Sequence, residues 1–141
     1  MGKINWGRVI LGGLVAGVVM NVIDYCVNVP LLGARWMSET NLLHMEHMPS
    51  AGMSAMGWIL SDLVIGWLAI WLYAGIRPRF NPGPKTALLA GFAVWALTSI
   101  AYSSFCFMGI YSHALIFHSA LGGLVAKVLG TWVGAMIYKE A

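Results

Sequence analysis

Long apolar segments alternate with short polar ones along the whole chain. The apolar segments run approximately over residues 8–32, 56–76, 85–108 and 112–138. Each is long enough to cross a bilayer, because a transmembrane helix needs about 20 predominantly apolar residues. The pattern therefore predicts one all-α domain, 1–141, built as a bundle of four transmembrane helices.

The polar connections predict where these helices begin and end. The segment 30–33, which contains a proline and a glycine, is expected to end the first helix. The stretch 77–84 contains three prolines, which favour a stiff turn that cannot be helical. In the long connection 33–55, Ser38 is a candidate N-cap and Pro49 a stop signal. We therefore expect a short helix in this connection, lying at the outer membrane surface.

Composition and charge favour a membrane protein and predict its orientation. The sequence is 60% hydrophobic and 9% charged, whereas soluble domains carry about 25% charged residues. One side of the predicted bundle holds six basic residues and the other holds Arg35, so the positive-inside rule predicts that both termini are cytoplasmic. The same asymmetry accounts for the net charge of +3 without a nucleic-acid partner, for which no basic stripe is present. The six basic residues are Lys3, Arg8, Arg77, Arg79, Lys85 and Lys139.

Small residues recur at helical spacing in the first and fourth predicted helices. Spacings of three and four residues place them on one face of a helix, and small side chains let two helix backbones approach closely. The packing partner is either another helix of this chain or a second copy of it. The expected packing residues are Gly13 and Gly17 in the first helix and Gly122, Ala126, Gly130 and Gly134 in the fourth.

Three ionisable residues, Asp24, Asp62 and Lys127, lie inside the apolar segments. Such residues face the interior of a bundle, pair with one another and often serve a function. With a rise of about 1.5 Å per residue, they lie roughly 24, 21 and 17 Å from the cytoplasmic ends of their helices. We expect Lys127 to pair with one or both aspartates. Further hydrogen bonds to this network are expected from Asn21, Thr98 and Tyr102.

Such a network has two interpretations. A purely structural ion pair would fix the order and register of the helices. A functional network would exploit its charge, because one ammonium between two carboxylates leaves a net negative charge and favours a bound proton in a low dielectric. That site could relay protons, or bind a small cation or an amine.

Histidines and cysteines offer weaker candidate sites. His44 and His47 are three residues apart in a methionine-rich stretch, a combination that suits copper, especially Cu(I). His118, near the outer end of the fourth helix, is a candidate ligand for haem or a chlorophyll-type pigment. Cys26 and Cys106 have similar predicted heights, so either a disulfide or two buried free thiols is expected.

Three stretches resemble small bacterial four-helix membrane proteins of unknown function. They are INWGR at 4–8, VPLLGARWM at 29–37 and IRPRFNPGPKTA at 76–87. The resemblance implies a multi-pass bundle in the bacterial inner membrane and supplies no catalytic residues.

Three functions agree with these observations. No nucleophile elbow, zinc-protease motif or phosphate-binding loop is present, so the chain is not expected to be an enzyme. The first expectation is an accessory or structural subunit that packs against protein partners in a larger membrane complex. The alternative is a small oligomeric transporter or proton- or cation-coupled module that uses the Asp/Lys network. A third is a metal-, haem- or pigment-binding membrane protein.

Overall fold

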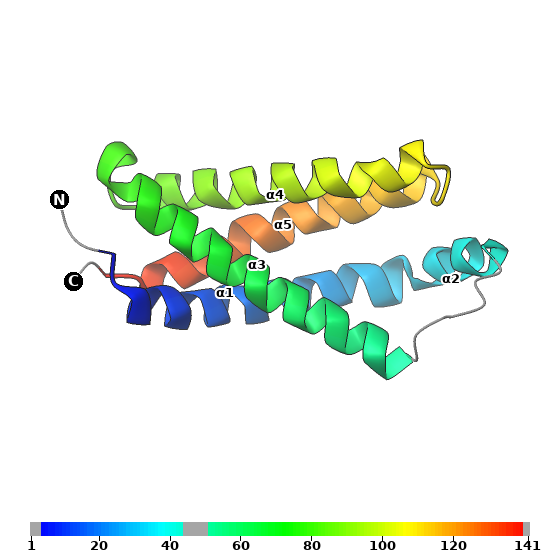
Figure 1. The fold of residues 1–141 in the computed structure, drawn as a ribbon, viewed down its shortest axis with the longest axis horizontal. Coiled ribbons are helices and arrows are strands. Elements are labelled where there is room, and N and C mark those ends of the chain that lie inside the picture. The colour runs from blue at the N-terminus through cyan, green and yellow to red at the C-terminus, as the bar shows by residue number, and fades with distance from the viewer. Residues whose placement is uncertain (1–3, 44–50, 140–141) are drawn as a thin grey trace.

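The computed structural model describes residues 4–43 and 51–139, and these are helical almost throughout (Figure 1). Four helical segments are long and apolar enough to cross a membrane. The prediction of an all-α bundle with four such helices is confirmed, and the chain is a multi-pass membrane protein. In chain order the elements are α1 (Trp6–Cys26), the π-helical segment η1 (Val27–Leu31), α2 (Gly33–Leu42), α3 (Ala51–Phe80), α4 (Pro84–Phe107) and α5 (His113–Ile137).

Local capping interactions determine where the long helices start. The side chain of Asn5 accepts a hydrogen bond from the backbone of Arg8 (3.2 Å) at the start of α1. Ser112 caps α5 in the same way by accepting from the backbone of Leu115 (3.2 Å). Both caps satisfy backbone N–H groups that have no partner within the helix. α4 instead begins at Pro84, whose fixed φ suits the first turn.

The four long helices alternate in direction (Figure 1). The start of α1, the α3–α4 turn and the end of α5 lie at one end of the bundle, called here the termini end. α2 and the α4–α5 turn lie at the other, the α2 end. α1 packs against both α3 and α5, and α4 packs mainly against α5. Figure 1 shows α3 crossing α1 obliquely and diverging from its neighbours toward the α2 end.

Glycines let α1 and α3 touch backbone to backbone where they cross. A Cβ on Gly13 would lie 2.6 Å from the Cα of Trp67, and a Cβ on Gly17 would lie 2.6 Å from the Cα of Leu63. Distances this short leave no room for a side chain at either of these two positions of α1. The glycine face of α1 therefore packs against α3 of the same chain.

The small-residue stripe of α5 packs against the adjoining face of α1. A Cβ on Gly130 would lie 2.9 Å from the carbonyl oxygen of Ala16, and Ala126 is fully buried. The partner of this stripe is thus within the chain. The other two members of the stripe are also close to α1 and η1, Gly134 to Gly12 and Gly122 to Val27.

The expected proline turn is shorter than the sequence suggested. α3 continues through Pro78 and ends at Phe80, so the prediction of a non-helical stretch over 77–84 is wrong for its first half. Pro78 lies in the last turn of α3, where a missing N–H removes one helical hydrogen bond and disturbs little beyond it. The reversal itself uses Asn81 (φ 67°) and Gly83 (φ 144°), residue types that adopt positive φ most readily.

The short helix at the α2 end also starts earlier than expected. The chain passes from α1 through η1, which contains Pro30, directly into α2 at Gly33. Ser38 is therefore inside α2 and not its N-cap, and its hydroxyl donates to the carbonyl of Arg35 (2.9 Å). A π-helical turn accommodates Pro30 because the helix winds wider there instead of stopping. The expected stop at Pro49 lies outside the described residues.

Candidate functional site

Three ionisable side chains from three helices meet inside the bundle. Lys127 of α5 donates hydrogen bonds to Oδ2 of Asp24 in α1 and to Oδ1 of Asp62 in α3, the latter at 3.4 Å. Both contacts are ion pairs. We call these three residues the triad.

The triad is largely shielded from its surroundings. Asp62 is 7% and Lys127 is 8% exposed. The side chain of Asp24 is 19% exposed, which makes it the most accessible of the three. Buried charges of this kind are tolerated only when they are paired and hydrogen-bonded.

The glycine contacts of α1 determine where the triad forms. Gly17 precedes Asp24 by two helical turns on the same face, and a Cβ there would lie 2.9 Å from the backbone oxygen of Asp62. The crossing of α1 and α3 therefore delivers both carboxylates to one region. On α5, Gly130 meets α1 within one turn of Lys127, so that the ammonium reaches the same place.

The charges of the triad do not balance. One ammonium faces two carboxylates, so ionisation of all three groups leaves one negative charge in excess. An uncompensated charge in a low-dielectric environment favours the binding of a proton or another cation. This imbalance is the main chemical property of the site.

The side chains expected to complete the network bond elsewhere. Asn21 donates to the carbonyls of Gly17 (3.0 Å) and Ile59 (3.2 Å), and Thr98 donates to the Val94 carbonyl of its own helix (3.0 Å). Backbone carbonyls one turn away compete successfully for such short side chains.

Tyr102, the third expected partner, belongs to an aromatic cluster at the α2 end. Its ring centroid lies 6.4 Å from those of Trp36 and Trp58, and Trp36 also contacts Tyr111 at 5.1 Å. Trp58 precedes Asp62 by one helical turn, so the cluster lies beyond the triad toward the α2 end. These aromatic contacts join α2, α3, α4 and the α4–α5 turn, and no spacing in the sequence predicts them.

Asn28 is a central residue that the sequence analysis left out of the site. Its Nδ2 donates to the backbone oxygen of Asp24 (3.0 Å), and its Oδ1 accepts from Trp36 Nε1 (3.1 Å) and from the hydroxyl of Ser119 (3.0 Å). One amide thus links α1, α2 and α5. The available signal was its position one turn beyond Asp24 on the same face of the helix.

A second link attaches α2 to the rest of the bundle. The carboxylate of Glu39 accepts from the backbone N–H (2.7 Å) and the hydroxyl (2.6 Å) of Ser112, at the start of α5. A negative charge is favourable there because the N-terminus of a helix is the positive end of its dipole.

The structure describes one of the three candidate metal and cofactor ligands, His118, and it does not contact the triad. His44 and His47 fall outside the described residues. His118 is exposed on α5, with Nδ1 2.6 Å from the carbonyl of Ala114. Among the described residues, no three His, Cys, Asp or Glu side chains form a cluster that could hold a metal ion.

Both cysteines are free thiols in the structure. Cys26 is exposed, so the expectation that it is a buried thiol is wrong. Cys106 is half-buried, with its sulfur 4.0 Å from the carbonyl of Ser112.

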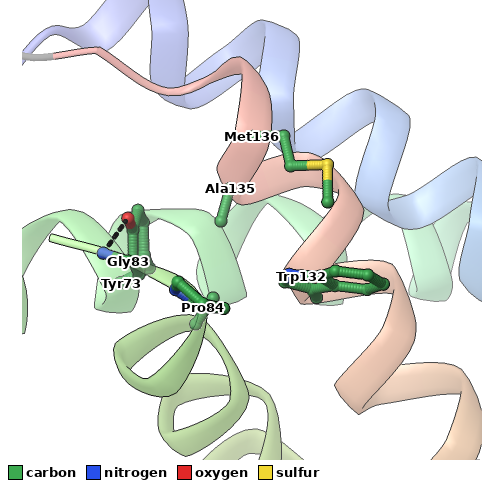
Figure 2. A pocket seen from close by; sticks show the side chains of 7 residues that line it. Tyr73, Gly83, Pro84, Trp132, Ala135 and Met136 are labelled. Carbon is green, nitrogen blue, oxygen red and sulfur yellow. Dashed lines mark hydrogen bonds between the residues drawn. The ribbon is translucent and has the colours of Figure 1, made fainter.

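A shallow pocket of about 320 Å³ lies at the termini end, away from the triad. Figure 2 shows Ala135 of α5 pointing toward Gly83 and Pro84, with Trp132 and Met136 beside it on the same helix. The N–H of Gly83 donates to the Tyr73 hydroxyl (3.4 Å). The other side chains that line it are largely apolar, which suits contact with lipid acyl chains. The triad is therefore the candidate site for chemistry.

Comparisons with protein-family models, with curated proteins and with solved structures found no match to this chain.

Proposed function

We propose that this chain is a small proton- or cation-coupled module of a bacterial cytoplasmic membrane, with the triad as its binding site. The observation that carries the proposal is the position of Lys127 between the carboxylates of Asp24 and Asp62. The ammonium neutralises one carboxylate, and the remaining negative charge favours a bound proton or a small monovalent cation. An ionisable group inside a membrane bundle is a frequent mark of an ion or proton pathway.

The use of the small-residue stripes also supports this proposal over an accessory subunit. The sequence left open whether these stripes pack against helices of this chain or against a second copy. In the structure Gly13 and Gly17 contact α3 of the same chain, and Gly130 contacts α1. The stripes therefore give no support to an external partner, whereas the triad gives direct support to ion binding.

The distribution of basic residues supports cytoplasmic termini. The termini end carries five described basic residues, and Arg35 in α2 is at the opposite end. Under the positive-inside rule the termini end then faces the cytoplasm. The five residues are Arg8, Arg77, Arg79, Lys85 and Lys139.

Infrared difference spectroscopy of the protein in liposomes tests the binding site directly. We expect a carbonyl stretch from a protonated carboxyl group that disappears when the pH is raised or when Na⁺, K⁺ or Li⁺ displaces the proton. The double variant Asp24→Asn, Asp62→Asn should lack this band, and Lys127→Arg, which keeps the positive charge, should retain it. Identical difference spectra for the wild type and the double variant would refute the proposal.

An accessory subunit is the second candidate, and the α2-end half of α3 favours it. There α3 diverges from the bundle, Trp58 is 61% exposed, and nothing lies within 4 Å of a Cβ placed on Gly57. Isolation in mild detergent separates the candidates. Larger subunits that co-purify would favour the accessory role, and a single species made only of this chain would favour the module.

A further inference from the structure

We infer that the triad exchanges its proton or cation with one side of the membrane only, the side that carries α2. The inference rests on the proposed function, because it assigns a direction of access to the same site. The evidence is that the bundle is tightly packed and apolar on the termini side of the triad, whereas half-buried polar side chains lie on the α2 side.

Toward the termini end, tightly packed apolar groups close the bundle. Met20 of α1 and Ile70 of α3 are fully buried, and a Cβ on Gly130 of α5 would lie 2.7 Å from the Cγ of Met20. Thr131, one turn from Lys127, is also fully buried, and its hydroxyl donates to the Lys127 carbonyl (2.6 Å). Interiors packed this closely hold water only where polar groups remain to bind it.

Toward the α2 end, half-buried polar side chains continue from the triad. Asn28 and Ser119 are each half-buried, and the hydrogen bond from Ser119 to Asn28 joins α5 to η1 one turn beyond Asp24. Asp24 is itself the most accessible carboxylate. Polar groups at partial exposure can bind water and carry a small ion between the triad and the surface.

The contacts between the helix backbones also differ between the two sides of the triad. α1, α3 and α5 are in backbone contact on the termini side of the triad, at Gly13, Gly17 and Gly130. Beyond the triad α5 still packs against η1 at Gly122, but α3 diverges, and it is linked to α2 and α4 by the aromatic cluster of Trp36, Trp58, Tyr102 and Tyr111. Side chains change rotamer on shorter timescales than packed helices separate, so the α2 side opens more readily than the backbone contacts do.

Several titratable groups lie near the route besides the triad itself. Tyr102 of α4 and Tyr111 of the α4–α5 turn belong to the aromatic cluster, and Glu39 of α2 is bonded to Ser112. The first turns of α5 also carry His113 and His118, the latter next to Ser119. A response to pH on the α2 side is therefore assigned to the triad only when it is lost in the Asp24→Asn, Asp62→Asn double variant.

Thiol labelling in liposomes tests the direction of access without reference to function. In a background carrying Cys26→Ser and Cys106→Ser, single cysteines replace Ser119, Thr131 and Leu121. Ser119 is half-buried on the proposed route, Thr131 lies on the closed side, and Leu121 is 46% exposed on the outer surface of α5. Each variant is treated from one side at a time with a charged, membrane-impermeant thiosulfonate.

We expect the Ser119→Cys protein to react from the α2 side at least tenfold faster than the other two, and none to react from the termini side. Leu121→Cys controls for contact with lipid, where a charged reagent does not reach a thiol. Equal reactivity of Thr131→Cys, or an unreactive Ser119→Cys, would overturn the inference.

The infrared band of the protonated carboxyl group shows from which side of the membrane the triad exchanges its proton. In liposomes with one protein orientation, it should follow the pH on the α2 side and ignore the pH on the termini side. A band that follows the termini side overturns the inference and leaves the proposed function intact. A missing band with one-sided labelling of Ser119→Cys removes the proposed function, and the exchange inferred from it, while the labelling still locates the water-accessible side.

Discussion

Removing the ammonium of Lys127 should destabilise the bundle far more than removing one of its partners. In Lys127→Met both carboxylates lose their counter-ion inside the bilayer. Breaking a buried ion pair by deleting one partner costs about 3–5 kcal/mol. The gross attraction to Asp62 alone, at 3.4 Å and an effective dielectric of 20, is about 5 kcal/mol, most of which offsets desolvation. Asp62→Asn instead leaves Asp24 and Lys127 as a neutral pair, so its cost should be about 1 kcal/mol or less.

Titration of the folded protein with SDS in mixed micelles measures these differences. Tryptophan fluorescence and far-ultraviolet circular dichroism report the loss of structure. Because about 1.4 kcal/mol corresponds to a factor of ten, Lys127→Met should shift the unfolding constant by roughly two to four powers of ten. Lys127→Arg, which preserves the charge, is the control for the change of side chain. An Asp62→Asn protein as unstable as Lys127→Met, or a Lys127→Met protein as stable as the wild type, would refute the charge balance described for the triad.

Two further predictions concern packing and the attachment of α2. Gly17→Ala places a methyl group 2.6 Å from the Cα of Leu63 and should cost about 1–3 kcal/mol in the same titration, whereas Gly57→Ala, with nothing within 4 Å, should be neutral or slightly stabilising. Equal effects of the two alanines would contradict the close approach of α1 and α3. Glu39→Gln weakens the capping of α5 at Ser112 and should cost about 0.5–1 kcal/mol, with faster hydrogen exchange confined to α2 and the start of α5. Unchanged exchange in α2 would show that this contact does not hold α2 in place.

The sequence was sufficient to predict the number of transmembrane helices and the pairing of the charged residues inside them. Apolar length alone located the four spans, because the bilayer imposes one length on all of them. The heights of Asp24, Asp62 and Lys127 indicated that they could meet, and the structure brings them together. This succeeded because charged groups inside a membrane have few favourable arrangements other than pairing.

The details that sequence reasoning missed depend on tertiary contacts. Asn21 and Thr98 were assigned to the network by height, but height does not show that a nearby backbone carbonyl will take the hydrogen bond. Pro78 was taken as a helix breaker, although a proline in a final turn has little helix left to break. Asn28 lies in η1, one turn beyond Asp24, and its hydrogen bond to Trp36 depends on the way η1 redirects the chain into α2.

The order of synthesis gives the triad a consequence for membrane insertion. Lys127 follows Asp24 by 103 residues and Asp62 by 65 residues in the chain. At a translation rate of about 5–20 residues per second, the first aspartate waits roughly 5–20 s for its cation. A nascent chain that ends before α5 therefore holds two acidic groups and no ammonium to pair with them. The last helix completes the charge balance of the earlier ones, so truncation or delayed release of α5 should leave an assembly intermediate that quality-control proteases can recognise.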